Sequence, residues 1–580
     1  MKSAHAKTQR RKEEDGILLD APLFADLDRH FARFIARFGG GETVALAAAH
    51  LSRAVRQGHI CLDLAQPPLS DAGEPLSWLP LEDWRAALAA SPAVGAPSEA
   101  ATPLVLDAAG RLYLRRYFAY ETELAGALLR RAASATGESP VEGQEAAVER
   151  AVSSPLTLLS GGPGTGKTTT AARILLRLMP PGAQPLRLAL AAPTGKAAAR
   201  LEEALRASLS RHERPDLLAA LPRAGTLHRL LGIRPGAARP RHDAANPLAL
   251  DVLVVDEASM VPLPLMAKLL DALPPAARLL LLGDRDQLAS VDPGNVLADM
   301  VDAASSPVSP LRGTLAVLRQ NYRFGNASPI YRLCEVVRAG LSAEALALLR
   351  EPASGGENGL GSALLPAPQK LEVALRDPVL AGYGPLLRES DPGRALEAFG
   401  RFRILCAVRK GPYGAEELNR RAAALLRREA GRPEREGELF AGTPLLITQN
   451  AHGLGLFNGD VGVLLPDPSE PDGPLWAWFP GEGAATAPRR VAPAQLPPHE
   501  PAFAMTVHKS QGSEFDHVLL VLPERDSPVL TRELIYTGLT RARRRVDLWA
   551  GPGVLERGVA RRMERASGLR DRLTGSPHPK

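Results

Sequence analysis

Residues 161–168 carry the first pattern with a clear chemical meaning, because they read GGPGTGKT. This matches GxxxxGK[ST], in which glycines let backbone N–H groups surround a phosphate and the lysine adds positive charge. We expect Lys167 to reach the β- and γ-phosphates of ATP and Thr168 to ligate Mg2+. The segments TLLS before the loop and TTAARILLRL after it predict the strand and helix that a phosphate loop requires. The expected ATP-binding residues of the loop are Gly161, Gly162, Pro163, Gly164, Thr165, Gly166, Lys167, Thr168 and Thr169.

Two acidic residues, Asp256 and Glu257, follow the apolar run LDVLVV. A carboxylate at such a strand end can hold Mg2+, and a second can polarise the attacking water. Another apolar run, ARLLLL, leads into a loop that carries Gln287, with Asp284 nearby. We interpret Gln287 as a sensor of the γ-phosphate. Together these residues indicate that ATP is hydrolysed as well as bound.

Two arginines lie well outside this first set of motifs: Arg323 in LRQNYRF and Arg541 in ELIYTGLTRARRRV. An arginine presented from another domain can stabilise the charge on the transferred phosphoryl group, which makes hydrolysis depend on closure of a cleft. For the neighbouring Arg543, Arg544 and Arg545 we favour a solvated or DNA-facing basic surface.

The elements that must position these residues are short apolar strands alternating with helices. Strands are expected in 155–160, 187–193, 250–258 and 277–284, as in a doubly wound α/β domain that binds ligands at the carboxyl ends of its strands. A second such domain is expected to contain strands 402–408 and 516–522 and to be interrupted by a small β insertion, in which Asn458–Gly459 is the clearest hairpin signal. The predicted divisions are a helical N-terminal domain at 1–135, an α/β domain at 136–311, a second α/β domain at 312–429 and 501–580, and the insertion at 430–500.

The first block is rich in Ala, Leu and Arg at helical spacing, which predicts helices over 43–58 and 112–132. A small and polar stretch at 133–143 is a credible linker.

Length, composition and net charge limit the number of domains and the classes of protein to which the chain can belong. A chain of 580 residues with 45% hydrophobic content predicts three or four domains, and a net charge of +6 permits a polyanionic partner without demonstrating one. Cys61, Cys334 and Cys406 form no CxxC, which argues against a metal framework and suits a reducing compartment. We find no segment resembling a signal peptide and no apolar run of the roughly 18 residues a membrane helix needs, so we expect a cytoplasmic protein with no membrane contact.

The motifs, taken in order, resemble those of superfamily-one helicases. They are the phosphate loop, APTGKAAARL (192–201), TLHRLLG (226–232), VVDEASM, GDRDQL, NYR, TVHKSQGSEFD (506–516) and YTGLTRAR (536–543). Within that superfamily the chain is similar to the RecD helicases, the alpha subunits of exodeoxyribonuclease V, in QGHICLDL (57–64), LYLRRYFAYE (112–121) and FNGDVG (457–462). The resemblance implies two RecA-like P-loop NTPase domains, with a small β (SH3-like) insertion and a helical N-terminal domain that docks partners.

The resemblance also implies further residue roles. Gln144 would contact adenine, Glu514 would reach the ribose, and Gln287, Arg323 and Arg541 would close on the γ-phosphate. The residues implied to lie near single-stranded DNA are Thr194, His228, Thr506 and His508. For the two histidines, a structural hydrogen bond remains the alternative interpretation.

The implied function is ATP-dependent unwinding of double-strand-break ends for recombinational repair, with 5′ to 3′ movement on one strand. The implied partners are DNA, as single strands and duplex ends, and the beta (RecB) and gamma (RecC) subunits of a RecBCD heterotrimer. One alternative is a stand-alone RecD-like helicase, which usually carries a longer amino-terminal region. Others are a nucleotide-binding module without hydrolysis, against which the complete motif set argues, and a conjugative relaxase-helicase, for which His5, His30, His50 and His59 are too widely spaced.

Nuclease chemistry needs carboxylates clustered around metal ions, commonly beside a lysine. Asp256 and Glu257 already serve ATP in this interpretation, and we find no second acidic cluster with a strand-borne lysine. We therefore expect no nuclease site in this chain and place the exonuclease of the complex in the beta subunit.

Overall fold

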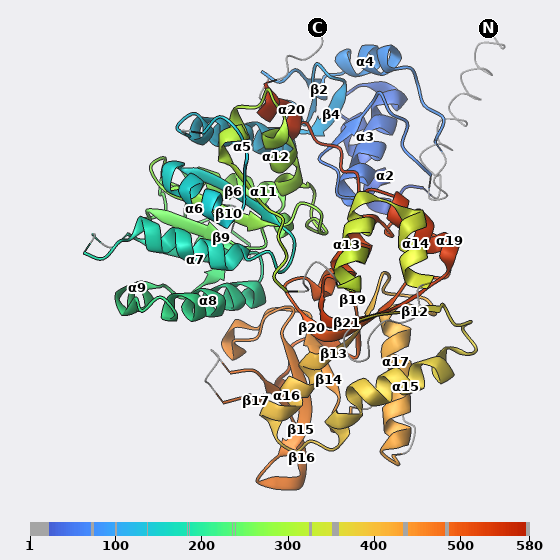
Figure 1. Ribbon diagram of the computed structural model, residues 1–580. Helices are drawn as coiled ribbons and strands as arrows, with labels where there is room; N and C mark the ends of the chain where they lie inside the picture. Colours follow the sequence, from blue (N-terminus) through green and yellow to red (C-terminus); the bar gives the residue numbers. More distant parts are fainter. Residues whose placement is uncertain are drawn as a thin grey trace, which may run out of the picture.

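The computed structural model describes residues 23–575, except 71–74, 99–100, 136, 183, 185, 235, 238, 324–327, 351–358, 433–438 and 482–486. The expectation of no signal-like segment, and His5, therefore lie outside the described residues. Figure 1 shows the N-terminal domain at the top right, one α/β domain at the left, and a second α/β domain with a β insertion below. Within the described ranges, no helix combines the length and apolar character needed to cross a bilayer.

The N-terminal domain contains the predicted helices and also a small sheet that we did not predict. Residues 112–114, predicted as helix, are a strand instead, because Leu112 and Tyr113 are fully buried between helices on both sides. The other strands have two or three residues, too few to show a period-two pattern in the sequence. The helices are α2 (Asp26–Ala36), α3 (Gly41–Arg56), α4 (Leu81–Ala89) and α5 (Arg115–Ala132), and the strands, in the order β1-β4-β3-β2, are β1 (Cys61–Asp63), β2 (Val94–Gly95), β3 (Leu104–Leu106) and β4 (Arg111–Leu114).

The first α/β domain is built on a seven-stranded parallel sheet in the order β5-β11-β6-β10-β9-β7-β8. All four predicted strands are present, and their apolar runs follow from burial of the sheet on both faces. The strands are β5 (Val141–Glu142), β6 (Leu156–Gly161), β7 (Leu188–Ala192), β8 (Gly225–Thr226), β9 (Val252–Val255), β10 (Arg278–Gly283) and β11 (Leu315–Leu318). The α-helices are α6 (Gln144–Ser153), α7 (Lys167–Leu178), α8 (Gly195–Ser210), α9 (Pro215–Ala220), α10 (Leu227–Leu230), α11 (Leu263–Ala272) and α12 (Val296–Ser305).

The predicted end of this domain at residue 311 is too early. Strand β11 begins at Leu315 and pairs with β6, beside the strand that leads into the phosphate loop. The segment that carries Arg323 therefore leaves the first sheet directly.

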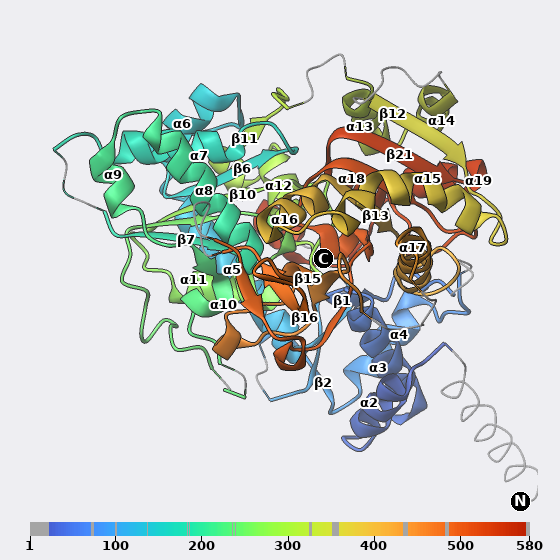
Figure 2. The same ribbon diagram turned by 90° about the horizontal axis from the view of Figure 1, so that it is seen from below.

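The second α/β domain has five parallel strands in the order β12-β21-β20-β13-β19. Alternate residues of β20 enter two different cores, one with α13, α14, α18 and α19 and the other with α15, α16 and α17. Figure 2 shows α13 and α14 on the opposite side of β12 and β21 from α15. The strands are β12 (Gly359–Leu364), β13 (Phe402–Cys406), β19 (Ala504–Thr506), β20 (Phe515–Val521) and β21 (Ala542–Ala550), and the helices are α13 (Pro329–Ala339), α14 (Ser342–Arg350), α15 (Leu371–Tyr383), α16 (Pro392–Arg401), α17 (Ala415–Glu429), α18 (Arg532–Leu539) and α19 (Pro552–Ala560).

The β insertion is a five-stranded antiparallel sheet in the order β17-β16-β15-β14-β18. Asn458–Gly459 lies in the long connection between β14 and β15, whereas the tight turn falls between Asp467 and Glu470. The hairpin prediction was therefore right about the strands and wrong about the turn, and the SH3-like character stays a prediction. The strands are β14 (Pro444–Ile447), β15 (Val461–Asp467), β16 (Glu470–Phe479), β17 (Arg489–Val491) and β18 (His499–Pro501).

The segment after α19, residues 561–575, leaves the second α/β domain, to which we had assigned it. Its helix α20 (Leu569–Thr574) packs against α5 and α12, beside the N-terminal domain (Figure 1). Backbone hydrogen bonds join Ile60 N to Ala566 O at 2.9 Å, and the fully buried Glu121 carboxylate accepts from Gly568 N at 3.0 Å and Arg572 Nε at 2.9 Å. We call residues 561–575 the returning segment.

Candidate active site

The phosphate loop joins β6 to α7 at the carboxyl edge of the first sheet. Gly164 and Gly166 have φ of 80° and 84°, a left-handed conformation that glycine adopts without steric cost. The Lys167 ammonium donates to the carbonyl oxygens of Gly161 at 2.6 Å and Gly162 at 3.1 Å, so it lies over the loop. Thr168 is half-buried at the start of α7 and Thr169 is exposed.

A second layer of contacts, which the sequence did not reveal, braces this loop. Asn321 Nδ2 donates to Pro163 O at 2.8 Å, and Tyr322 N donates to Gly164 O at 2.8 Å. Gln144 Nε2 reaches Thr165 O at 3.4 Å. The NYR motif therefore packs directly on the loop, and the only advance signal for Asn321 was its place in that motif.

Asp256 and Glu257 follow β9, two strands away from β6 in the sheet. Burial and the neighbouring Glu257 carboxylate raise the pKa of Asp256, while Lys167 opposes this shift. Glu257 has a φ of 51°, an uncommon left-handed conformation for a residue other than glycine. Such strain at a predicted catalytic residue is typical of functional sites.

Gln287 and Arg541 meet across the two α/β domains. Arg541, which is 3% exposed, donates from NH2 to Gln287 Oε1 at 2.9 Å, and Gln287 Nε2 donates to Asp284 Oδ2 at 3.1 Å. The buried Tyr536 hydroxyl donates to the same Asp284 oxygen at 3.0 Å. Tyr536 is a functional candidate that we missed, although it stands in the quoted YTGLTRAR motif.

Glu514 pairs with Arg323, and its second carboxylate oxygen accepts from Arg543 Nε at 3.3 Å. Burial alone would raise the pKa of Glu514, but Arg323, Arg200 and Arg541 lower it to about 2. Arg323, Arg541 and Glu514 therefore lie in one charged cluster. Arg200 of α8 was not among the predicted site residues, although it lies in the APTGKAAARL motif.

The four predicted DNA-contacting residues are less closely grouped. Thr194 caps α8 by accepting from Ala197 N at 3.2 Å. Thr194 also lies close to Gly512 of the second α/β domain, because a Cβ added to Gly512 would be 3.8 Å from Thr194 Oγ1. Thr506 ends β19, and both Thr506 and His508 are half-buried, whereas His228 is exposed on α10. Burial lowers the pKa of His508, with Arg565 acting in the same direction.

Comparison with known proteins shows the relationship of the whole chain. It is 42% identical to the RecBCD enzyme subunit RecD of Mycobacterium tuberculosis, over 94% of this chain and 94% of that protein. The chain belongs to the RecD family. The same RecD subunit of Haemophilus influenzae is 37% identical over 73% of this chain and 71% of that protein.

Separate regions match separate families. Residues 20–113 match the family described as "RecBCD enzyme subunit RecD, N-terminal domain". Residues 144–293 match the AAA domain, and residues 501–548 match the UvrD-like helicase C-terminal domain. The ATP-dependent RecD2 DNA helicase of Deinococcus radiodurans is 34% identical over 70% of this chain but only 48% of that protein. Among solved structures, two coordinating Pif1 helicases at forked dsDNA are similar at 17% identity and a TM-score of 0.39, over 70% of this chain and 91% of the Pif1 chain. The predicted resemblance to the RecD family is confirmed.

Proposed function

We propose that the protein is a RecD-type helicase subunit that uses ATP hydrolysis to move 5′ to 3′ along one DNA strand. The observation that carries this proposal is the hydrogen bond between Arg541 and Gln287, because it joins the second α/β domain to the sensor loop of the first. Lys167 lies on the first domain, so an anion bound there and contacted by Arg541 would draw the two domains together. Alternate closing and opening can then move a strand that each domain grips in turn.

Each residue of the cluster has a role in this proposal. Glu257 polarises the attacking water, while Arg323 and Arg541 stabilise charge on the transferred phosphoryl group. Gln144, at the start of α6, is proposed to contact the adenine. Glu514 is proposed to contact the ribose. Thr194, His228, Thr506 and His508 are proposed to contact the single strand.

We infer that Mg2+ accompanies the nucleotide. Mg2+ prefers oxygen ligands, and the Thr168 hydroxyl with the Asp256 carboxylate supplies them. Burial and the Glu257 carboxylate raise the pKa of Asp256, and a divalent cation bound there would favour its ionised form. Mg2+ would supply charge neutralisation on the transferred phosphoryl group.

Strand displacement tests the motor and its direction. We expect the full chain to displace a labelled oligonucleotide from a duplex with a 5′ single-stranded tail, and to require ATP. A matched substrate with a 3′ tail serves as the direction control, and Glu257→Gln as the hydrolysis control. Displacement restricted to the 3′-tailed substrate would refute the proposed direction, and displacement by Glu257→Gln would refute the role of that residue.

We further propose that the N-terminal domain docks RecB- and RecC-type subunits. Helix α2 and the turn after it expose an apolar stripe of Leu27, Phe34 and Phe38, which are 62%, 49% and 47% exposed. Such a stripe at the outside of a domain is typical of a protein contact. Deleting the domain would not test this, because α5 shares a core with α11 and α12 of the first α/β domain.

A surface substitution tests the docking proposal instead. Phe34→Ser should reduce co-purification with the beta and gamma subunits while leaving the ATPase intact. Leu79→Ser is the matched control, since Leu79 is 41% exposed in the same domain but outside the stripe. Full retention of both partners by Phe34→Ser would place the interface elsewhere.

Two smaller proposals complete the assignment. Among the described residues, no group of three or more His, Cys, Asp or Glu side chains is arranged to hold a metal ion, and we propose that this chain cuts no DNA by itself. Magnesium-dependent degradation by the purified chain, with partner subunits shown to be absent, would contradict this. The buried free thiols of Cys61, Cys334 and Cys406 suit a reducing compartment, and we propose the cytoplasm.

A further inference from the structure

A cavity of about 530 Å3 lies in the second α/β domain, between helix α17 and the strands β18 and β19. We call it the α17 pocket. Its apolar wall is formed by Ala423, Ala424, Leu439, Phe440 and Phe503. Its size falls within the range of sites that hold small ligands, and none of the nucleotide-site residues lines it.

The polar lining of the pocket carries an excess of positive charge. Ion pairs join Arg409 to Glu416 at 2.9 Å and Lys509 to Glu500 at 2.6 Å, whereas Arg427 stacks over the Phe440 ring at 4.9 Å. The lining holds four cations, Arg409, Arg420, Arg427 and Lys509, and two carboxylates, Glu416 and Glu500. Arg420 also pairs at 2.8 Å with Glu417, which lies outside the lining, so the local excess is one positive charge. The pocket therefore suits a ligand with an anionic group and a flat apolar group.

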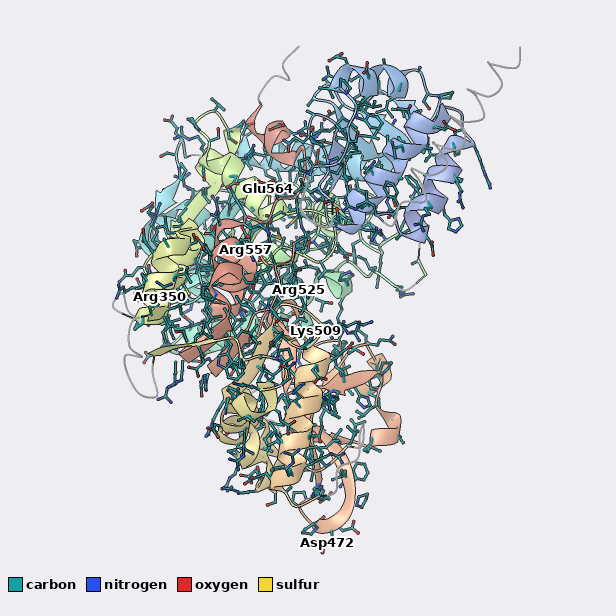
Figure 3. The ribbon with its side chains drawn as sticks, turned by 90° about the vertical axis from the view of Figure 1, so that its right-hand side faces the viewer. Arg350, Asp472, Lys509, Arg525, Arg557 and Glu564 are labelled. Atoms are coloured by element: carbon teal, nitrogen blue, oxygen red, sulfur yellow. The ribbon has the colours of Figure 1, made fainter. Side chains whose placement is uncertain are left out.

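A single chain segment links one edge of the pocket to the predicted ATP site. Thr506 and Lys509 line the pocket, and the same segment continues to Gln511, whose Nε2 donates to Leu288 O of the first α/β domain at 2.9 Å. Ser513 O then accepts from Arg541 NH1 at 3.3 Å. Figure 3 shows Lys509 at the waist of the molecule, far from Asp472 at the tip of the insertion.

An extended peptide would meet an occupied position on the nearest strand edge. At Ala504 of β19, Asn419 Oδ1 accepts from the backbone N at 2.9 Å and Asn419 Nδ2 donates to the backbone O at 2.8 Å. Strand addition needs free backbone groups on such an edge. Single-stranded nucleic acid instead needs backbone charge and a surface for its bases, and the pocket offers both.

We propose that the α17 pocket takes one unstacked nucleotide of the translocated DNA strand. The base lies against the apolar wall around Phe440, and its phosphate lies on Arg420 and Lys509. This inference rests on the proposed DNA motor and adds a site that reports strand occupancy to the ATP cleft through residues 506–513.

The test compares substitutions on one helix of the full chain. Ala424→Phe fills the pocket without changing charge, and Arg420→Gln removes one cation. Arg428→Gln is the matched control, because Arg428 is an exposed arginine of α17 that pairs with Glu372 and does not line the pocket. The measurement is the oligothymidine concentration that gives half-maximal ATPase stimulation.

We expect both pocket substitutions to raise that concentration, Ala424→Phe by about tenfold, the order lost with one stacked base. The effect should fall on the half-saturating concentration and not on turnover at saturating DNA, and Arg428→Gln should match the wild type. An oligonucleotide carrying 5-iododeoxyuridine should cross-link to the peptide containing Phe440, and Ala424→Phe should remove that cross-link. If Ala424→Phe fails to fold, the cross-link in the wild type and Arg420→Gln still decide the matter.

Different failures have different meanings. DNA stimulation in the wild type that both pocket variants retain unchanged would overturn the pocket assignment and leave the motor standing. No DNA stimulation in the wild type would remove the proposed function and this inference with it. If the wild type binds thymidine monophosphate and only Ala424→Phe loses that binding, the pocket is a site for a free nucleotide. If the variants lose a partner subunit while their response to DNA is unchanged, the pocket is a protein-binding site.

Discussion

In the first α/β domain, strand β6 leads into a loop that contains Gly162, Gly164 and Gly166, and Lys167 begins α7. In the second α/β domain, the inner strand β13 ends in AVRKGPYG and leads to α17 through Gly414, with no GxxxxGK pattern. The two sheets are alike in strand direction but differ in this loop. The second domain contributes Glu514 and Arg541 from other segments. We therefore expect the first domain to hold the phosphates and the second to contribute the arginine Arg541 across the domain contact.

The largest expected effect comes from removing the lysine of the GxxxxGK pattern, which only the first of these two loops contains. Lys167→Ala should abolish ATP hydrolysis while the fold persists, because it removes the charge over the phosphate loop. The control is Lys410→Ala, which removes the lysine after β13 and should leave hydrolysis in place. Turnover is measured with and without DNA, and folding by circular dichroism. Substantial turnover by a folded Lys167→Ala protein would show that Lys167 is not required and that the two loops do not differ in the proposed way.

The sensing side is tested by its arginines. Arg541→Ala and Arg323→Ala should each lower turnover on the order of 10³-fold, the scale of a catalytic arginine, with nucleotide binding much less affected. Arg544→Ala, which changes an exposed arginine of the same basic run, is the control. Single-turnover hydrolysis and equilibrium binding separate the two steps. Normal hydrolysis in either variant would refute the proposed catalytic role of that arginine.

A smaller effect is expected at the carboxylate that pairs with Arg323. Glu514→Gln should raise the ATP concentration for half-maximal turnover, on the order of tenfold for a lost charge-assisted hydrogen bond. Asp516→Asn is the matched control, because Asp516 lies 4.0 Å from Arg543 and is more exposed. Equal behaviour of the two variants would show that Glu514 has no special position.

The smallest effect should appear in pH dependence. The pKa of Glu514 is lowered to about 2 in the folded protein, below its value of about 4.3 in an unfolded chain. The ionised form therefore stabilises the fold above about pH 4.3, and this contribution is lost as pH falls toward 2. Thermal unfolding between pH 5 and 3 should show a steeper loss for the wild type than for Glu514→Gln. Parallel curves would mean that the pair does not stabilise domain contact.

The sequence could predict that Lys167, Asp256 and Gln287 lie at one edge of the first sheet, while their roles toward ATP stay predictions. Lys167, Asp256 and Gln287 each follow a buried apolar strand, and parallel strands bring such ends to one edge. The Arg323–Glu514 pair joins residues 191 positions apart, so only the fold could reveal it. The β1–β4 sheet escaped prediction because its strands have two to four residues.

The packing of the returning segment could not be predicted from the sequence for a related reason. Helix α20 has six residues, and its periodicity says nothing about which core it enters. Leu569 and Leu573 are fully buried in a core shared with α5 and α12, which come far earlier in the chain. The predicted domain at 501–580 was wrong there because two leucines in a six-residue helix do not indicate which domain core they enter.

The returning segment also sets an order for biosynthesis. A nascent chain normally completes its amino-terminal domains while the ribosome is still adding later residues. Here, Glu121 is enclosed by Gly568 and Arg572, and without them this carboxylate has lost its charged partner. We expect the core around Glu121 to stay open until the returning segment is added, because closing it earlier would bury the carboxylate without its charged partner. The first half of the protein therefore reaches its final core only after residues 566–573 have emerged.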